Sequence, residues 1–338
     1  MGFITPSVPF AERRIIYMTA RIRYMDIAKG IGIICVLVGH TFSWENVGVL
    51  VNTFHMPLFF IISGFFFSPK QHMKLMDNKR LLLPYGVTIL SFFFFFLLHG
   101  KYEEALTWCW GGVYGSGYDY ELPFFIKGTG GIWFFLALFW TKNIANEIIK
   151  ISEKYQVLIV IAVVYVGVQT YKCFVFPWSI QNGMTASLFF IFGYYAKREN
   201  IFKNLNFAYT LICFIIWLYC YKYYGTVIMV NCYIPNIMTI IGALCGSVVI
   251  IFFSMMIEKN NMIGKMLEHI GKMTMIILCV HIFELHTGIL LGVQGFLRDQ
   301  VHVYIHIFIL RCICSFGIGN IIYVFSKKYI TRVNSRIR

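Results

Sequence analysis

The sequence predicts an all-α integral membrane protein with about ten transmembrane helices and both termini in the cytosol. Three observations lead to this class: the composition, the apolar segments and the placement of the basic residues. Of the 338 residues, 59% are hydrophobic and 13% charged, and the mean hydropathy is +0.70. These values lie far outside the range of soluble domains.

Ten apolar segments along the chain are candidate spans. They cover approximately residues 27–44, 50–67, 81–98, 131–148, 156–171, 180–196, 206–221, 234–257, 273–294 and 302–326. Segment 131–148 has a clean apolar run only from Gly131 to Trp140, and segment 156–171 is short for a crossing. These two therefore need independent support.

That support comes from the Lys and Arg residues, because cytoplasmic loops carry an excess of them. With ten spans, 23 of the 29 lie on the side of the N-terminus and five on the other. Omitting 131–148 or 156–171 alone would remove the asymmetry, so we keep both. We expect residues 1–26 to form a basic cytosolic segment, 27–326 the transmembrane domain and 327–338 a basic cytosolic tail.

The net charge and the cysteines exclude two further classes. The formal net charge is +14, but the basic residues form short clusters between apolar segments, which is a topology signal and does not predict nucleic-acid binding. The ten Cys lie mostly inside apolar segments without paired CxxC motifs. We therefore expect no metal site and no disulfide framework.

The first span carries a histidine deep in the membrane. His40 follows Lys29 by eleven residues, which at about 1.5 Å per residue is roughly 16 Å along a helix, or about half of a ~30 Å hydrocarbon core. An imidazole at that depth is either a functional group or a histidine hydrogen-bonded between packed helices. Taken alone, His40 fits both interpretations.

Other ionisable residues lie at matched depth. His281 and Arg311 are at a depth similar to that of His40 in the last two spans, His55 is in the outer half of the second, and Glu284 shares a helix face with His281. Groups from separate helices at one depth predict a shared cavity. Alternatively, Arg311 pairs with Glu284 or with helix-end carbonyls, and His55 satisfies carbonyls freed by a nearby proline.

The longest polar connection, from about His99 to Gly130, is expected outside. It contains Trp108, Trp110, Asp119 and Glu121 among other aromatic residues and glycines. Aromatic faces beside carboxylates suit a sugar, and we predict that Asp119 and Glu121 contact one. The tryptophans fit an interfacial aromatic belt at least as well.

Basic residues also stand at the cytosolic ends of the spans, including Lys29 and Arg80. Anchoring at lipid phosphates explains most of them. Lys29 differs because it shares a helix with His40, so it could hold the phosphates of a donor whose reactive end reaches the imidazole.

Several motifs follow one another in order along the chain. They are Arg23-Tyr-Met-Asp26-Ile-Ala-Lys29-Gly30 with Gly39-His40, Phe54-His-Met-Pro57-Leu-Phe-Phe-Ile-Ile-Ser-Gly64, Arg80-Leu-Leu-Leu-Pro84-Tyr85, Trp133-Phe-Phe-Leu136, Pro177-Trp178 with Gly193-Tyr194, and Ile270-Gly271-Lys-Met-Thr274. With them the sequence resembles the acyltransferase family 3 membrane proteins, especially the sugar O-acetyltransferases similar to fucose 4-O-acetylases.

The resemblance implies a ten-helix acyltransferase that takes acetyl from cytosolic acetyl-CoA and delivers it to a hydroxyl of a saccharide or glycolipid. The family's basic-X10-His motif maps onto Lys29 and His40, with Lys where many relatives have Arg, so the charge stays but the bidentate fork is lost. We expect a multi-pass protein of the cytoplasmic (inner) membrane of a bacterium, with no metal and no nucleic acid among its partners.

Roles for the site residues follow from this reading. His40 is the expected general base, with a transient acyl-His as a variant, and His281 or Arg311 would stabilise the oxyanion. The donor would contact Lys29, Asp26 and Arg80, and the acceptor His55, Trp133, Asp119 and Glu121.

Two other functions are consistent with intramembrane His and Arg. A transporter or proton-coupled flippase for a lipid-linked sugar would use them as a proton relay, although we find no internal repeat of the kind many transporters have. A scaffold without catalysis would tolerate replacement of both His40 and Lys29.

Overall fold

The computed structural model describes residues 22–42, 46–121, 124–290 and 303–336. Of the described residues, 82% are helical, and they form no strand apart from the isolated bridges Tyr120–Ile126 and Ile228–Tyr233. The predicted all-α class is confirmed. Residues 1–21 of the expected basic N-terminal segment and residues 291–302 between the last two spans lie outside the described residues.

Each of the ten predicted spans corresponds, in order, to a helix or a pair of helices. The α-helices are α2 (Arg23–Thr41), α3 (Asn46–Asn52), α4 (His55–Phe65), α5 (Lys79–Leu98), α6 (Tyr102–Tyr114), α7 (Trp133–Lys150), α8 (Glu153–Cys173), α9 (Ile180–Arg198), α10 (Phe207–Tyr224), α11 (Ile237–Glu258), α12 (Asn261–Lys272), α13 (Thr274–Thr287) and α15 (Val303–Arg336). Short 3₁₀ turns are η1 (Leu75–Asn78), η2 (Gly130–Ile132), η3 (Pro177–Ser179), η4 (Ile201–Asn204) and η5 (Met229–Asn231).

Six helical segments of the described chain are long and apolar enough to cross a membrane. They are Arg23–Thr41, Asn46–Phe65, Leu75–Leu98, Glu153–Cys173, Ile237–Glu258 and Tyr304–Lys328, and the pair α12–α13, bent by 69°, makes a seventh if it is one span. The chain is therefore a multi-pass membrane protein. The other three predicted spans correspond to α7, α9 and α10, so ten crossings stay a prediction.

Charge and polarity explain why two of these three helices fall short. The last turns of α7 carry Lys142, Glu147 and Lys150. In α9 the buried side chains include Gln181, Asn182 and other polar residues. The polar side chains of α9 lie inside the bundle, where neighbouring helices can satisfy them rather than lipid, whereas Glu147 and Lys150 are exposed at the end of α7.

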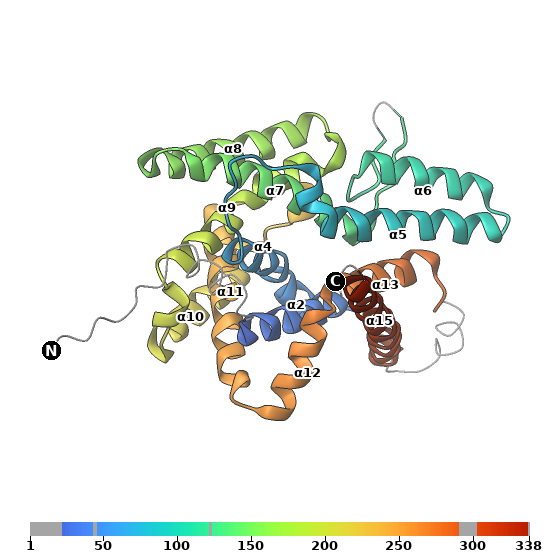
Figure 1. Cartoon of the computed structure of the whole chain (residues 1–338). Helices are drawn as coiled ribbons and strands as arrows, with labels where there is room; N and C mark the ends of the chain where they lie inside the picture. Colours follow the sequence, from blue (N-terminus) through green and yellow to red (C-terminus); the bar gives the residue numbers. More distant parts are fainter. Residues whose placement is uncertain (1–21, 43–45, 122–123, 291–302, 337–338) are drawn as a thin grey trace.

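Figure 1 shows α2 and α4 in the middle of the molecule. In this view α5 to α8 lie above them, α10 to α12 lie to the left and below, and α13 and α15 lie to the right. Large buried phenylalanines, among them Phe60, Phe135 and Phe190, fill the core between these layers. The central position of α2 places His40 within reach of several other helices.

Two helices lie in segments that the sequence analysis treated as connections. The first, α6, packs along α5, where Trp108 stacks on Phe92 with ring centroids 3.9 Å apart and the Tyr85 hydroxyl donates to the carbonyl of Gly112 at 2.6 Å. The second, α12, precedes α13 and packs along α2. Both are too short for a crossing, so hydropathy alone did not reveal them.

The crossing of α2 and α12 brings their backbones into direct contact. A Cβ atom on Gly271 would overlap the carbonyl oxygen of Asp26, and one on Gly30 would overlap that of Leu267. An ion pair of 2.9 Å between Arg23 and Glu268 joins the same two helices. Because the chain turns by 69° directly after α12, this crossing also fixes where α13 begins beside α2.

Candidate active site

A cavity of about 600 Å³ lies between α2, α4, α7, α13 and the loop that follows α10. Most of its lining is aliphatic or aromatic. The polar and amphipathic members include His40, Asn52, His55, Tyr118, Trp133 and Thr226. This volume and a largely apolar wall with a few polar groups are typical of ligand sites.

One face of α2 forms a wall of the cavity. Ile33, Val36 and His40 line it, and Lys29 lies one turn before Ile33 on the same face. Eleven residues make three helical turns, so Lys29 and His40 are about 16 Å apart along one side of the helix. The spacing that singled out these residues in the sequence thus corresponds to a shared orientation.

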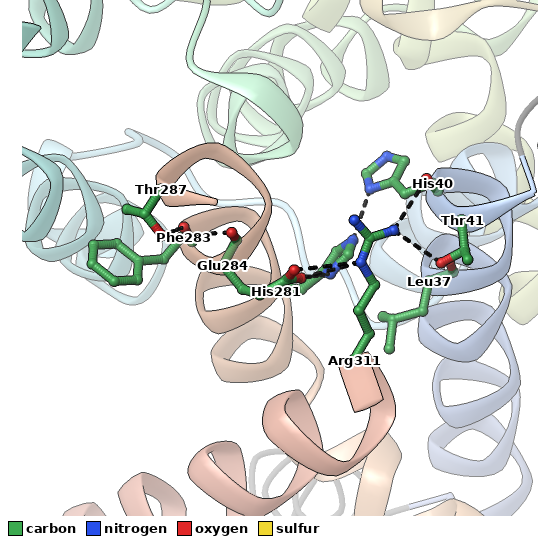
Figure 2. A network of polar contacts seen from close by, with 8 residues as sticks. All are labelled: Leu37, His40, Thr41, His281, Phe283, Glu284, Thr287 and Arg311. Carbon is green, nitrogen blue, oxygen red and sulfur yellow. Dashed lines mark hydrogen bonds and ion pairs between the residues drawn. The ribbon is translucent and has the colours of Figure 1, made fainter. Parts of the chain in front are cut away.

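His40 is held by a second histidine. Its Nδ1 lies 2.9 Å from Nε2 of His281 on α13, and the two rings stack with centroids 5.1 Å apart (Figure 2). Among the described residues, Nε2 of His40 has no hydrogen-bond partner. The imidazole therefore uses one nitrogen for α13 and leaves the other for a ligand in the cavity.

Behind His281 lies a buried ion pair. Nδ1 of His281 is 3.5 Å from Oε2 of Glu284, and Nε of Arg311 lies 3.4 Å and 3.3 Å from Oε1 and Oε2 of that carboxylate. Arg311 also donates through Nη1 to Oγ1 of Thr41 at 3.1 Å and to the carbonyl oxygen of His40 at 3.4 Å. Figure 2 shows these contacts joining α2, α13 and α15.

The three residues predicted as catalytic thus lie together, but only one of them faces the cavity. Within the described chain, neither His281 nor Arg311 lines it. Both partners considered for Arg311, Glu284 and a helix-end carbonyl, are among its contacts.

Two of the four predicted acceptor-binding residues line the cavity. Nδ1 of His55 donates to the carbonyl of Val51 at 2.9 Å, where the chain breaks between α3 and α4, and this leaves Nε2 as an acceptor. Trp133, the first residue of α7, is buried against the same cavity. His55 therefore both satisfies a freed carbonyl and borders the site.

The other two, Asp119 and Glu121, do not belong to the lining that the described residues form. Asp119 accepts from the backbone N–H of Gly128 at 2.9 Å and pairs with Lys127 at 3.3 Å, so its carboxylate holds its own loop together. Glu121 is exposed. Tyr118, next to Asp119, is the residue through which this loop reaches the cavity.

The predicted donor-binding residues lie toward the N-terminal end of α2. Nζ of Lys29 is 2.7 Å from Oδ1 of the buried Asp26 and 5.6 Å from the centre of the Phe66 ring. Arg80 is exposed in the first turn of α5, and none of these three residues belongs to the cavity lining that the described residues form. Lys29 and Asp26 thus form one unit, and Arg80 stands apart from it.

The sequence analysis missed the loop after α10. Thr226 to Val230 line the cavity, and Nδ2 of Asn182 on α9 donates to the carbonyls of Met229 at 3.0 Å and Val230 at 2.7 Å. The available signal was Asn182 itself, an amide within an apolar segment. Among the described residues there is also no group of three His, Cys, Asp or Glu that could hold a metal ion.

Comparison with known proteins gives one match. The family model for an acyltransferase domain, that of acyltransferase family 3, matches residues 22–325 and so covers α2 to most of α15. No curated protein and no solved structure matches the chain.

Proposed function

The chain belongs to acyltransferase family 3 and is an acyltransferase, and from this premise we propose that it moves an acetyl group from acetyl-CoA to a hydroxyl of a cell-surface or lipid-linked saccharide. We further propose that it crosses the cytoplasmic membrane of a bacterium ten times with both termini in the cytosol. This topology places the Lys29 end of α2 at the cytosolic face, where the donor is available.

The donor proposal rests on the side of α2 that carries Lys29, Ile33, Val36 and His40. Lys29, held by Asp26, would bind the phosphates of CoA, and Arg80 would add positive charge at the same membrane face. The flexible arm of CoA would lie against Ile33 and Val36, because an apolar wall suits it. Its thioester would then reach His40.

In the chemical step, Nε2 of His40 accepts the proton of the acceptor hydroxyl as its oxygen attacks the thioester carbonyl carbon. The tetrahedral intermediate collapses with cleavage of the C–S bond. The sulfur leaves with the electron pair and takes the proton from His40, which gives an acetyl ester and free CoA. The alternative order is attack by Nε2 itself, which breaks the C–S bond, expels the CoA thiolate and gives an acetyl-His40 intermediate. The acceptor hydroxyl then attacks the acetyl carbon, the C–N bond breaks to return neutral His40, and the hydroxyl proton passes to the thiolate.

The acceptor would bind at the other end of the cavity. His55 offers an unprotonated nitrogen to a hydroxyl, and Trp133 offers an aromatic surface to a sugar ring. Asp119 and Glu121 would contact parts of a larger saccharide that extend beyond the cavity.

One observation carries the proposal: His40 lines a cavity, and its hydrogen bond to His281 uses Nδ1 and leaves Nε2 without a partner among the described residues. The test is transfer of label from radiolabelled acetyl-CoA to a glycan acceptor by the purified protein. We expect His40→Ala to abolish transfer and His99→Ala to leave it unchanged, because His99 is exposed and outside the cavity lining. Movement of a lipid-linked sugar without label transfer by the wild-type protein would instead favour a transporter.

A further inference from the structure

We infer that Glu284, Arg311 and His281 form a positioning relay that keeps a proton on Nδ1 of His40 and so leaves Nε2 as the proton acceptor in the cavity. This inference rests on the proposed function, because it explains how His40 becomes a base. It assigns a role to Glu284 and changes the expected role of His281 and Arg311.

The relay starts at the carboxylate. Glu284 is buried, and both of its oxygens lie within 3.4 Å of Nε of Arg311. A guanidinium stays protonated in proteins, and an ionised carboxylate can only accept hydrogen bonds. Glu284 therefore presents acceptor oxygens to whatever faces it on the other side.

His281 is the group that faces it. The side chain is fully buried, and its Nδ1 lies 3.5 Å from Oε2 of Glu284, its only ionic partner among the described residues. The contact is an ion-pair distance and not a hydrogen bond, but two unprotonated atoms at this separation would still repel each other, whereas a proton on Nδ1 is attracted to the carboxylate. The proton of neutral His281 is therefore on Nδ1, and its Nε2 carries a lone pair.

The same reasoning sets the tautomer of His40. The 2.9 Å contact between Nδ1 of His40 and Nε2 of His281 needs one proton between the two nitrogens. Because Nε2 of His281 is the acceptor, Nδ1 of His40 is the donor. Nε2 of neutral His40 then holds the lone pair that a general base requires.

Arg311 fixes His40 through its backbone as well. It donates to the carbonyl of His40 and to Oγ1 of Thr41, while the Thr41 hydroxyl donates to the carbonyl of Leu37 at 2.8 Å. The end of α2 is thereby held by the same guanidinium that neutralises Glu284. Both the ring and the main chain of His40 depend on α13 and α15.

This arrangement does not fit stabilisation of an oxyanion by His281 or Arg311. A donor to the oxyanion must reach the reacting oxygen, and in the described structure neither residue lines the cavity. Their effect on the reaction would pass through His40. They are positioning residues, and Glu284 is the third.

The test compares substitutions of His281 that differ only in hydrogen bonding. In His281→Gln, the amide oxygen can still accept from Nδ1 of His40, whereas in His281→Leu nothing can. We expect His281→Leu to lower kcat by about 100-fold with the KM for acetyl-CoA unchanged, and His281→Gln to recover most of the loss. Because a smaller folded fraction would also lower the apparent kcat, kcat is calculated per folded protein, and recovery in His281→Gln then reports the hydrogen bond.

A double substitution guards against misfolding. Replacing only Glu284 or only Arg311 leaves the other as an unpaired buried charge. The double variant Glu284→Leu with Arg311→Met therefore removes both charges together. We expect this variant to unfold at a temperature near that of the wild type and yet lose kcat as His281→Leu does. The relay would be overturned if the double variant and His281→Leu both kept the wild-type kcat while His40→Ala was inactive. The proposed function would still stand.

A spectroscopic measurement tests the relay without any turnover. In the full chain in lipid nanodiscs with ¹⁵N-labelled histidine, the His40 signals are identified by their loss in His40→Gln. We expect a protonated Nδ1 and an unprotonated Nε2 in the wild type and a mixture of tautomers in the double variant. A proton on Nε2 in the wild type would refute the relay even if no acceptor had yet been found for the enzyme.

Discussion

Nδ1 of His40 lies 2.9 Å from Nε2 of His281, although 241 residues separate them in the sequence. The contact joins the first described helix to one of the last, and it occupies Nδ1 of His40, a residue that lines the cavity. Several consequences can be measured.

Substitution of Lys29 is expected to weaken donor binding without slowing the chemical step. A charge-assisted hydrogen bond contributes about 1.5–3 kcal/mol, so Lys29→Gln should raise the KM for acetyl-CoA by about tenfold or more with kcat nearly unchanged. Lys29→Arg keeps the charge and should keep the KM. Steady-state kinetics with varied acetyl-CoA measure both, with the exposed Lys79→Gln as the control; an unchanged KM in Lys29→Gln would remove Lys29 from the donor site.

Substitution of His55 is expected to act on the acceptor side. His55→Phe retains an aromatic ring in the cavity lining but loses both ring nitrogens and with them the hydrogen bond to Val51. We expect the KM for the glycan acceptor to rise by roughly tenfold, and the KM for acetyl-CoA to stay the same. A rise in the acetyl-CoA KM alone would place His55 on the donor side of the cavity.

The close contact of α2 and α12 at Gly271 predicts that replacing a glycine lowers the stability of the protein there but not at an open position. Gly271→Ala forces a methyl group against the backbone of Asp26, and overpacking of this kind costs about 1–3 kcal/mol. It should also lower kcat, because α13 follows directly from α12. Gly86→Ala in α5 is the matched control: a Cβ there has no neighbour within 4 Å, and it should stabilise the helix by about 0.5–1 kcal/mol. The measurements are the thermal unfolding and the kcat of both variants. Equal melting temperatures for Gly271→Ala and Gly86→Ala would contradict the predicted dependence on position.

Asn182 is expected to hold the acceptor side of the cavity in shape. Asn182→Leu leaves the carbonyls of Met229 and Val230 without their donor, which costs about 1–3 kcal/mol, and we expect a higher KM for the acceptor. Asn206→Ala serves as a control of comparable cost, about 1 kcal/mol, because it removes the N-cap of α10. If the two variants raise the acceptor KM equally, the effect comes from stability and not from the loop.

The helices were largely predictable because most expected spans are long apolar runs and charge placement supported the two weaker ones; all ten have helices in the structure. The helices α6 and α12 were not predicted, since 13 and 12 residues fall below the length of a crossing. Their existence depends on packing against α5 and α2. Contacts between helices distant in sequence leave no local signal.

The level of the site residues along their helices was predictable from the sequence, but the side of the helix that faces the cavity was not. Counting residues from the helix ends placed His40, His281 and Arg311 at one level, and the structure brings them together. It could not show which of them faces the cavity, because rotation about a helix axis is set by its neighbours. Nor could the sequence show that the carboxylate of Asp119 pairs with Lys127 and accepts from the backbone of Gly128 within its own loop.

The segments from Asp26 to His40 and from Gly271 to His281 form a closed frame. Main-chain contact at Asp26 and Gly271 shuts one corner, and the two imidazoles shut the opposite one. A frame closed at both corners limits how far α2 and α13 can shift against each other, and the 2.9 Å contact holds the two rings together. Substrate arriving at His40 would meet a base already aimed, with no reorganisation left to perform.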